Sequence, residues 1–353
     1  MIDVRGTAHR RRSVLALALV APLVGEFLLG NTPISELGSL IGLVPLYGCG
    51  AVLIREAARR TGRGWPAMLL LGAAYGLFEE GPVDQMLWNP RYGGVDFGLT
   101  YAGTHVPWLG TSVALLQDVV TMHMVWSVCV PIALVEAFGG GPRRPWLGRP
   151  GLIVTALVFA GGSASLAAVQ YVGNDRFMAS PWQWAVCVAA IAGLIAAAFR
   201  TGRRPVPAVP AAAPGPVPTG CAAFALTSAY WAGQALLRDR VPDWAMAAAW
   251  ALLAAAAVLT VTGWSRRHGW GPRHHTALAA GALLTYVWVG FTQAGQTGTP
   301  PATALIGNVV FGTGACVLAV AAVRSAGRRG DDPVPGGSGD QRDEDGVDDL
   351  LQG

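Results

Sequence analysis

The sequence predicts an all-α fold, a polytopic transmembrane helical bundle with about ten spans and both termini in the cytoplasm. The first observation behind this prediction is composition. Of the 353 residues, 52% are hydrophobic and only 13% are charged, and the mean hydropathy is +0.42. Soluble domains carry about 25% charged residues. The second observation is a series of apolar runs along the chain, and the third is the presence of arginines in every second connection between them.

Each apolar run supplies the roughly 20 residues that a helix needs to cross a hydrocarbon core about 30 Å thick. Helices are expected because a spanning segment must satisfy its backbone hydrogen bonds internally. In chain order, the predicted spans cover residues 13–30, 38–56, 65–86, 111–138, 151–172, 181–199, 220–237, 244–264, 276–293 and 302–323. The first run resembles a signal sequence, but its small residues Ala16 and Ala18 lie too early for cleavage, so we expect an uncleaved span.

Arginine placement predicts the orientation. Clusters occur before the first run and after the second, fourth, sixth, eighth and tenth runs: Arg10–Arg12, Arg55/Arg59/Arg60/Arg63, Arg143/Arg144/Arg149, Arg200/Arg203/Arg204, Arg266/Arg267/Arg273 and Arg324/Arg328/Arg329. The other connections hold only Arg91, Arg176, Arg238 and Arg240. Arginine and lysine are enriched in cytoplasmic loops. We therefore expect a multi-pass protein of the cell (inner, cytoplasmic) membrane.

The chain divides into four predicted parts. These are a six-span membrane part at 1–200, a Pro/Ala-rich cytoplasmic linker at 201–219, a four-span membrane part at 220–325 and a disordered acidic cytoplasmic tail at 326–353. Residues 330–353 hold eight acids and one arginine, which leaves 13 acids against 24 arginines elsewhere. Arginines beside apolar spans favour the lipid bilayer as the partner and disfavour nucleic acid. The sequence specifies no protein partner.

Prolines and ionisable residues gather in the first four predicted spans. Each of these spans contains one proline in its interior or near its end: Pro22, Pro45, Pro82 and Pro131. A proline removes a backbone hydrogen bond and kinks a helix. Four successive kinked helices suit an internal cavity, although close packing of the spans explains them equally well.

Four carboxylates in these spans are predicted to lie at one depth in the membrane. Counted from the run borders at 1.5 Å per residue, the layer contains Glu26, Glu79, Glu80 and Asp118. Glu79 and Glu80 lie about 21–23 Å from the inner edge at Trp65, toward the extracytoplasmic side. The same count puts His123 more than one helical turn deeper than Asp118. Ser127 shares a helix face with His123.

The layer has an electrostatic problem, because each unneutralised charge in a membrane costs several kcal/mol. One solution is a buried site that is neutralised by protons, a cation or Arg91. The other is a rim that reaches the outer water. Gly72 and Gly76 allow close helix approach on the stripe that leads to the glutamates, so this stripe is expected to face protein.

The segment Gly76-Leu77-Phe78-Glu79-Glu80-Gly81-Pro82 resembles the Glu-Glu motif of the CAAX-processing and bacteriocin-processing intramembrane protease family. Later motifs of that family resemble Tyr101-xxx-His105 and His123-xxx-Ser127 loosely. Asp84 stands where the family has arginine, and Ser127 replaces asparagine. The resemblance implies a hydrolase-like site with Glu79, Glu80 and His123 as catalytic residues. A divalent metal on Glu79, Glu80, His123 and Asp118 is then an open alternative, with Glu26 and Ser127 as polar lining.

Two further hypotheses remain open. A cation- or proton-coupled transporter would use the carboxylate layer of Glu26, Glu79, Glu80 and Asp118, and Gln293 and Asn308 could help to line a path. We see no internal repeat between the six-span and four-span parts, which disfavours an inverted-repeat transporter. The last hypothesis is a membrane assembly or structural protein without small-molecule chemistry.

Overall fold

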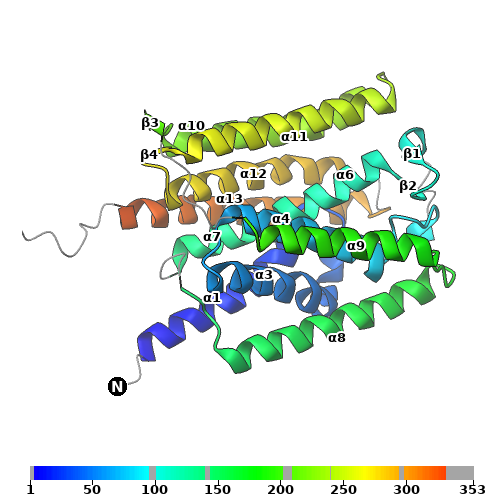
Figure 1. The fold of residues 1–353 in the computed structure, drawn as a ribbon, viewed down its shortest axis with the longest axis horizontal. Helices are drawn as coiled ribbons and strands as arrows, with labels where there is room; N and C mark the ends of the chain where they lie inside the picture. The colour runs from blue at the N-terminus through cyan, green and yellow to red at the C-terminus, as the bar shows by residue number, and fades with distance from the viewer. Residues whose placement is uncertain are drawn as a thin grey trace, which may run out of the picture.

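The computed structural model describes residues 4–94, 101–139, 144–201, 209–238, 240–293 and 298–330. In this part of the chain, long helices run alongside one another to form a bundle (Figure 1). The chain starts with α1 (Val4–Pro22) and its last helix is α13 (Pro301–Gly330). The start of α1 and the end of α13 lie at the same end of the bundle (Figure 1). The all-α class that the sequence predicts is confirmed.

The first part of the bundle contains helices that pass directly into π-helical turns. After α1 come η1 (Leu23–Leu28), η2 (Ile34–Ser39), α2 (Leu40–Leu43), η3 (Val44–Gly48), α3 (Cys49–Arg60), α4 (Trp65–Phe78), η4 (Glu79–Val83), η5 (Tyr92–Gly94), η6 (Ala102–Thr104), β1 (His105–Val106), β2 (Thr111–Ser112), α6 (Val113–Met122), η7 (His123–Cys129) and α7 (Val130–Phe138). Strands β1 and β2 pair antiparallel in a short hairpin.

The remaining elements are longer and more regular. They are α8 (Arg149–Gly173), α9 (Pro181–Ala198), β3 (Val209–Ala212), α10 (Pro216–Leu237), α11 (Asp243–Ser265), β4 (Arg267–His268), α12 (Pro272–Gln293) and α13. Strand β3 pairs parallel with β4 at the end of the bundle where the chain starts and α13 ends (Figure 1). The β1–β2 hairpin lies at the opposite end (Figure 1).

Most of each apolar run predicted as a span is helical in the structure. By length and composition, six helical segments of the described residues can cross a membrane: Ile34–Arg60, Val113–Phe138, Arg149–Gly173, Pro181–Ala198, Asp243–Ser265 and Pro301–Arg328. The other predicted runs are helical but fall outside this selection. The count of about ten spans and the cytoplasmic position of both termini therefore stay predictions.

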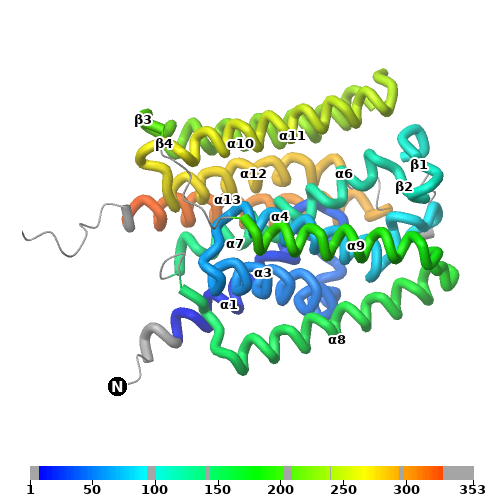
Figure 2. Tube along the Cα trace, in the orientation of Figure 1, coloured from blue at the N-terminus to red at the C-terminus, as the bar shows by residue number. Residues whose placement is uncertain are grey.

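The helices are arranged in layers, and the most exposed ones lie at the edges. Helices α8 and α11 lie on opposite sides of the bundle, with α12 and α13 between α11 and the centre (Figures 1 and 2). In α8 the only buried residue is Ser163, and in α11 it is Ala247, among the residues that the structure describes. Because both helices are apolar throughout, their exposed surfaces suit contact with lipid.

Two large hydrophobic clusters form the interior. One joins α1, α3, α4 and α7 around Leu17, Met68 and Ile132. The other joins η1, α7, α12 and α13 around Leu134 and Leu283. Helices from both predicted membrane parts thus share a buried core, while the division of the chain itself stays a prediction. Of the predicted linker, residues 209–212 form β3 and α10 starts at Pro216, whereas 202–208 lie outside the described residues. Residues 331–353 of the predicted tail also lie outside them.

The four prolines coincide with the π-helical turns. Pro22 precedes η1, Pro45 and Pro82 lie within η3 and η4, and Pro131 follows η7. Proline has no N–H to donate to the carbonyl four residues earlier, and its ring clashes with that carbonyl. A wider turn relieves this clash, and π-turns of this kind are frequent at functional sites. The prolines therefore do not merely bend the helices but change their local register.

Neighbouring helices contact the carbonyls near these prolines. The Cys187 thiol of α9 lies 3.5 Å from the carbonyl oxygen of Leu77, five residues before Pro82. In a π-helical pattern this carbonyl would accept from residue 82, and proline has no hydrogen to give. Such contacts allow a kinked helix to remain buried within a membrane bundle.

Candidate functional site

All of the predicted site residues except Asp118 come together where the π-helical turns of four segments meet. The turn η1 supplies Glu26, η3 supplies Tyr47, η4 supplies Glu79 and Glu80, and η7 supplies His123 and Ser127. Helix α4 adds Tyr75 one turn before the glutamates. We call these seven residues the carboxylate–histidine centre.

Glycines let the backbones of α4 and η7 approach each other. A Cβ atom at Gly76 would lie 3.1 Å from the Cβ of His123, and one at Gly72 would lie 3.1 Å from the Cα of Met124. These contacts are tighter than ordinary van der Waals packing, so a side chain at either position would push the helices apart. The prediction that the Gly72–Gly76 stripe faces protein is confirmed.

His123 lies between the two adjacent glutamates. Its Nε2 atom is 2.7 Å from Oε1 of Glu80, and its Nδ1 atom is 3.2 Å from Oε2 of Glu79. The Ser127 hydroxyl is also 3.2 Å from Nδ1. Glu79, Glu80 and His123 are 4%, 5% and 5% exposed, which places the contact in the protein interior. An imidazolium carries a hydrogen on each nitrogen, so Nε2 can donate to Glu80 while Nδ1 faces both Glu79 and Ser127.

Glu26 joins the same centre through tyrosine. The Tyr47 hydroxyl donates to Oε1 of Glu26, and the Thr32 hydroxyl donates to Oε2 of Glu26 over 3.3 Å. Glu79 in turn interacts with the side chain of Tyr47. The rings of Tyr47 and Tyr75 lie 5.7 and 5.9 Å from the imidazole ring, centroid to centroid. Tyrosine thereby connects Glu26 to the Glu79–His123–Glu80 group.

The centre holds more carboxylates than cations. Its described ion pairs join His123 to Glu79 and Glu80, and no arginine takes part in them. Oε2 of Glu80 has no hydrogen-bond partner in the described part of the chain, and the contact of Glu79 Oε2 with Nδ1 falls outside hydrogen-bond geometry. Three ionised carboxylates against one imidazolium would leave uncompensated buried charge, which costs several kcal/mol. Protons shared among these oxygens would remove the excess charge.

Asp118, the fourth carboxylate of the predicted layer, makes its contacts elsewhere. It accepts hydrogen bonds from the Tyr101 hydroxyl over 3.0 Å and from the Tyr230 hydroxyl of α10. Within the described residues, no group of three or more His, Cys, Asp and Glu side chains has the arrangement of a metal site. The predicted metal ligand set thus does not assemble as one group, while any metal role of Glu79, Glu80 and His123 stays a prediction.

The residue count placed Asp118 at the level of the glutamates and His123 more than one turn deeper, yet it is His123 that contacts both glutamates. Counting residues from the run borders assumed regular α-helices that cross straight. The π-helical turns at η4 and η7 alter both the rise and the direction of the side chains. Two other residues considered in the sequence analysis lie outside the centre: His105 is exposed in β1, and Arg91 is exposed before η5.

Sequence reasoning missed a second buried polar cluster, at the end of the bundle where α3 and α7 finish. Arg55 donates through Nε to Glu136 over 3.0 Å and through Nη1 to Glu56 over 2.8 Å. Arg59 donates twice to Glu136, over 2.9 and 2.5 Å. Glu56 also accepts from the backbone N–H of Trp146 over 2.8 Å. Arg55 and Glu56 are both 0% exposed. The adjacent opposite charges of Arg55 and Glu56 could have indicated this cluster. On sequence grounds, Arg55 counted only as one of the arginines that mark a cytoplasmic connection.

Comparison with known proteins gives a family and no activity. No curated protein and no solved structure matches the chain. A family model described as an uncharacterized membrane protein family matches residues 15–325. This match corrects the resemblance to the CAAX-processing and bacteriocin-processing proteases. Two adjacent glutamates form too short a motif to carry a family assignment when Asp84 and Ser127 replace its arginine and asparagine. The chain belongs to the uncharacterized membrane protein family whose model covers residues 15–325.

Proposed function

We propose that the chain is a proton-coupled membrane transport protein whose carboxylate–histidine centre carries the proton. The observation that supports this proposal is His123, which contacts Glu80 through one ring nitrogen and Glu79 through the other. Ionisable residues inside membrane bundles typically serve proton or ion pathways. Two acids joined by an imidazole can exchange a proton with little movement of heavy atoms.

The contacts define an order of groups through which a proton could move. Thr32 contacts Glu26, Glu26 contacts Tyr47, and Tyr47 interacts with Glu79. From there His123 leads to Glu80. In the last step, a neutral His123 that carries its hydrogen on Nε2 accepts a proton at Nδ1 from protonated Glu79, and the imidazolium then passes its Nε2 proton to Oε1 of Glu80. Glu80 becomes a neutral acid, and the imidazole is again neutral with its hydrogen on Nδ1.

The same geometry disfavours the hydrolase hypothesis. A general base must reach a water molecule beside the substrate, and a histidine that stabilises the reaction needs a nitrogen directed at it. Here both ring nitrogens of His123 contact carboxylates, and Glu79, Glu80 and His123 are buried. A proton reaches such a centre through hydrogen-bonded groups, whereas a peptide or lipid substrate needs open space.

The test uses purified protein in liposomes that contain a pH-sensitive dye. A potassium gradient with valinomycin sets an inside-negative potential, and proton entry is recorded. We expect wild-type protein to admit protons faster than protein-free liposomes, and Glu80→Gln and His123→Ala to reduce this rate at least tenfold. Asp118→Asn is the matched control, because it removes a buried carboxylate outside the centre. Equal rates for wild type and Glu80→Gln would contradict the proposal.

A further inference from the structure

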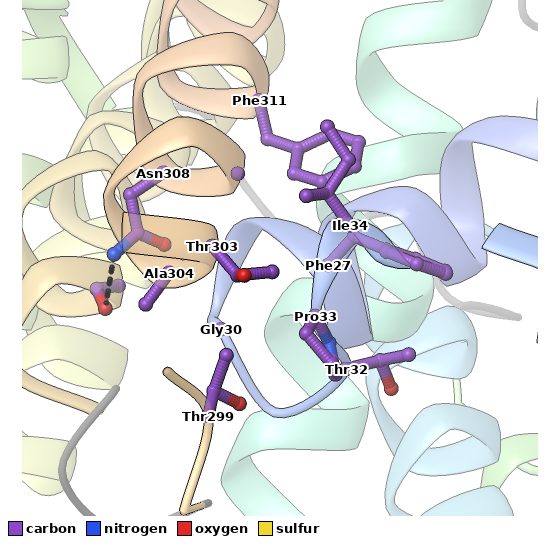
Figure 3. Close-up of a pocket in the computed structure, with 12 residues that line it drawn as sticks. Phe27, Gly30, Thr32, Pro33, Ile34, Thr299, Thr303, Ala304, Asn308 and Phe311 are labelled. Atoms are coloured by element: carbon purple, nitrogen blue, oxygen red, sulfur yellow. Dashed lines mark hydrogen bonds between the residues drawn. The ribbon is translucent and has the colours of Figure 1, made fainter. Parts of the chain in front are cut away.

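A small pocket lies beside Glu26, at the end of the bundle opposite the start of α1. It is bounded by the segment that follows η1, the end of α12 and the beginning of α13 (Figure 3). Its volume is about 10 Å³. A space of this size holds a single water molecule or a small ion. The lining includes Thr32, Thr303 and Asn308, whose side chains carry oxygen atoms.

The N–H groups of the backbone after η1 point away from the carbonyls of Leu28 and Leu29, the residues at the end of η1. The N–H groups of Gly30, Asn31 and Thr32 all donate to the carbonyl oxygen of Glu26, over 3.1, 3.1 and 3.4 Å. Gly30 permits this turn because its φ of +90° is a conformation that other residues rarely adopt. The amides that follow the helix are therefore not directed to the carbonyls of Leu28 and Leu29.

Those carbonyls gather with other oxygen atoms at Gly290 of α12. A Cβ at Gly290 would lie 2.6 Å from the carbonyl oxygen of Leu28, 3.2 Å from Oδ1 of Asn308 and 3.6 Å from the carbonyl oxygen of Leu29. A Cβ at Gly30 would lie 3.1 Å from the carbonyl oxygen of Gly290. Glycine at both positions brings several acceptor oxygens from three segments close to one another.

Asn308 is oriented to add one more acceptor. It is 6% exposed, and its Nδ2 donates to the carbonyl oxygen of Gly290 over 2.9 Å. This bond is drawn in Figure 3, where the amide oxygen of Asn308 points away from the bonded carbonyl. The hydrogen bond from Nδ2 thus fixes the orientation of the Asn308 amide, and Oδ1 lies close to Gly30 and Gly290.

The charge balance at the pocket favours a cation of low charge. Among the described residues its lining contains no ionised side chain, and the Glu26 carboxylate lies one hydrogen bond beyond Thr32. The C-terminal ends of η1 and α12 both meet here and present negative partial charge. Helix α13 begins here with the opposite polarity, which is reduced because Pro301 has no N–H. Divalent ions usually require several carboxylates or water ligands.

We propose that this pocket binds a monovalent alkali cation, with Na⁺ as the ion that its size favours. Carbonyls at helix ends together with neutral side-chain oxygens are the ligands that coordinate Na⁺ in membrane transporters. The proposal concerns the pocket alone and does not depend on proton movement through His123. Through Thr32 and Glu26, however, a bound cation would stand next to the carboxylate–histidine centre.

The test is equilibrium binding of ²²Na⁺ to the purified full chain in lipid nanodiscs, with choline chloride holding the ionic strength constant. We expect saturable binding that unlabelled sodium gluconate displaces. Asn308→Ala and Thr303→Val should each weaken binding at least tenfold, and the second variant keeps nearly the same side-chain shape. Gln117→Ala, in a separate polar pocket near Arg238, is the matched control and should leave binding unchanged.

Several results would overturn the site. The first is the absence of saturable ²²Na⁺ binding to wild-type protein. The second is unchanged binding in both Asn308→Ala and Thr303→Val, which would place the ion elsewhere. A third is loss of binding in Glu80→Gln, which would move the cation to the carboxylate–histidine centre. Saturable binding of ³⁶Cl⁻ that Asn308→Ala abolishes would show that the pocket selects anions. Retained binding in Glu80→Gln, together with its slowed proton entry, would separate this site from the proposed proton function.

Discussion

Gly48 packs directly against the backbone carbonyl of Ala18, so closely that a Cβ atom on Gly48 would overlap the carbonyl oxygen. Ala18 is the residue whose carbonyl loses its helical donor because Pro22 stands four positions later. The glycine thus allows η3 to approach a carbonyl that Pro22 deprives of its α-helical donor. The same contact sets the spacing between the turns that carry Glu26 and Tyr47.

Gly48→Ala is therefore expected to destabilise the fold. The added methyl group must displace backbone, and overpacking of this kind typically costs about 1–3 kcal/mol. Gly42→Ala is the matched control in the same helical stretch, because nothing lies within 4 Å of its Cβ position. It should be neutral or stabilise by about 0.5–1 kcal/mol. Thermal unfolding in detergent measures both, and equal midpoints for the two variants would refute the contact.

The buried Arg55–Glu136 network should be sensitive to the loss of one partner. Glu136→Leu would leave Arg55 and Arg59 without the carboxylate that both contact. Breaking a buried ion pair in this way typically costs about 3–5 kcal/mol. The control is Glu36→Ala, which removes an exposed acid and should change stability by less than about 0.5 kcal/mol. Unfolding by denaturant is the measurement, and a small effect of Glu136→Leu would show that water reaches these arginines.

Much of the fold follows from the sequence because its signals are strong and local. Low charge, long apolar runs and regularly placed arginines lead to an all-α membrane bundle without any long-range information. The adjacent Glu79 and Glu80, near the end of a glycine-containing apolar run, are also visible locally. So is His123, an ionisable residue within such a run. These residues do meet in the structure.

The rest depends on register and on tertiary contacts. Asp118 is only five residues before His123, yet it contacts Tyr101 and Tyr230 because α6 turns that face toward α10. Tyr47 sits two residues after Pro45 and becomes a bridge only through the π-helical turn at η3. Glu56 and Glu136 are 80 positions apart in the sequence. Both contact Arg55, and only the folded chain brings Glu136 to this arginine. These contacts cannot be predicted from the hydropathy pattern of the sequence.

His123 and Glu80 should be energetically coupled. In a double-mutant cycle with His123→Gln and Glu80→Gln, we expect a coupling energy of about 1–3 kcal/mol, because the 2.7 Å contact is buried and charge-assisted. The matched cycle pairs His123→Gln with Asp118→Asn and should be additive within about 0.5 kcal/mol. Unfolding free energies of all variants in one detergent give both numbers. Additivity in the first cycle would mean that the two side chains do not interact in solution.

The orientation in the membrane can be tested at the two ends of the bundle. Trp108 is 68% exposed between β1 and β2, and Ala211 is exposed in β3 at the opposite end. The arginine pattern puts the first site outside the cell and the second in the cytoplasm. With Cys221, the exposed native cysteine, replaced by alanine, a membrane-impermeant maleimide should label Trp108→Cys in intact cells. Ala211→Cys should be labelled only after permeabilisation. The reverse pattern would invert the topology, and labelling of both in intact cells would contradict a bundle that spans the membrane between these ends.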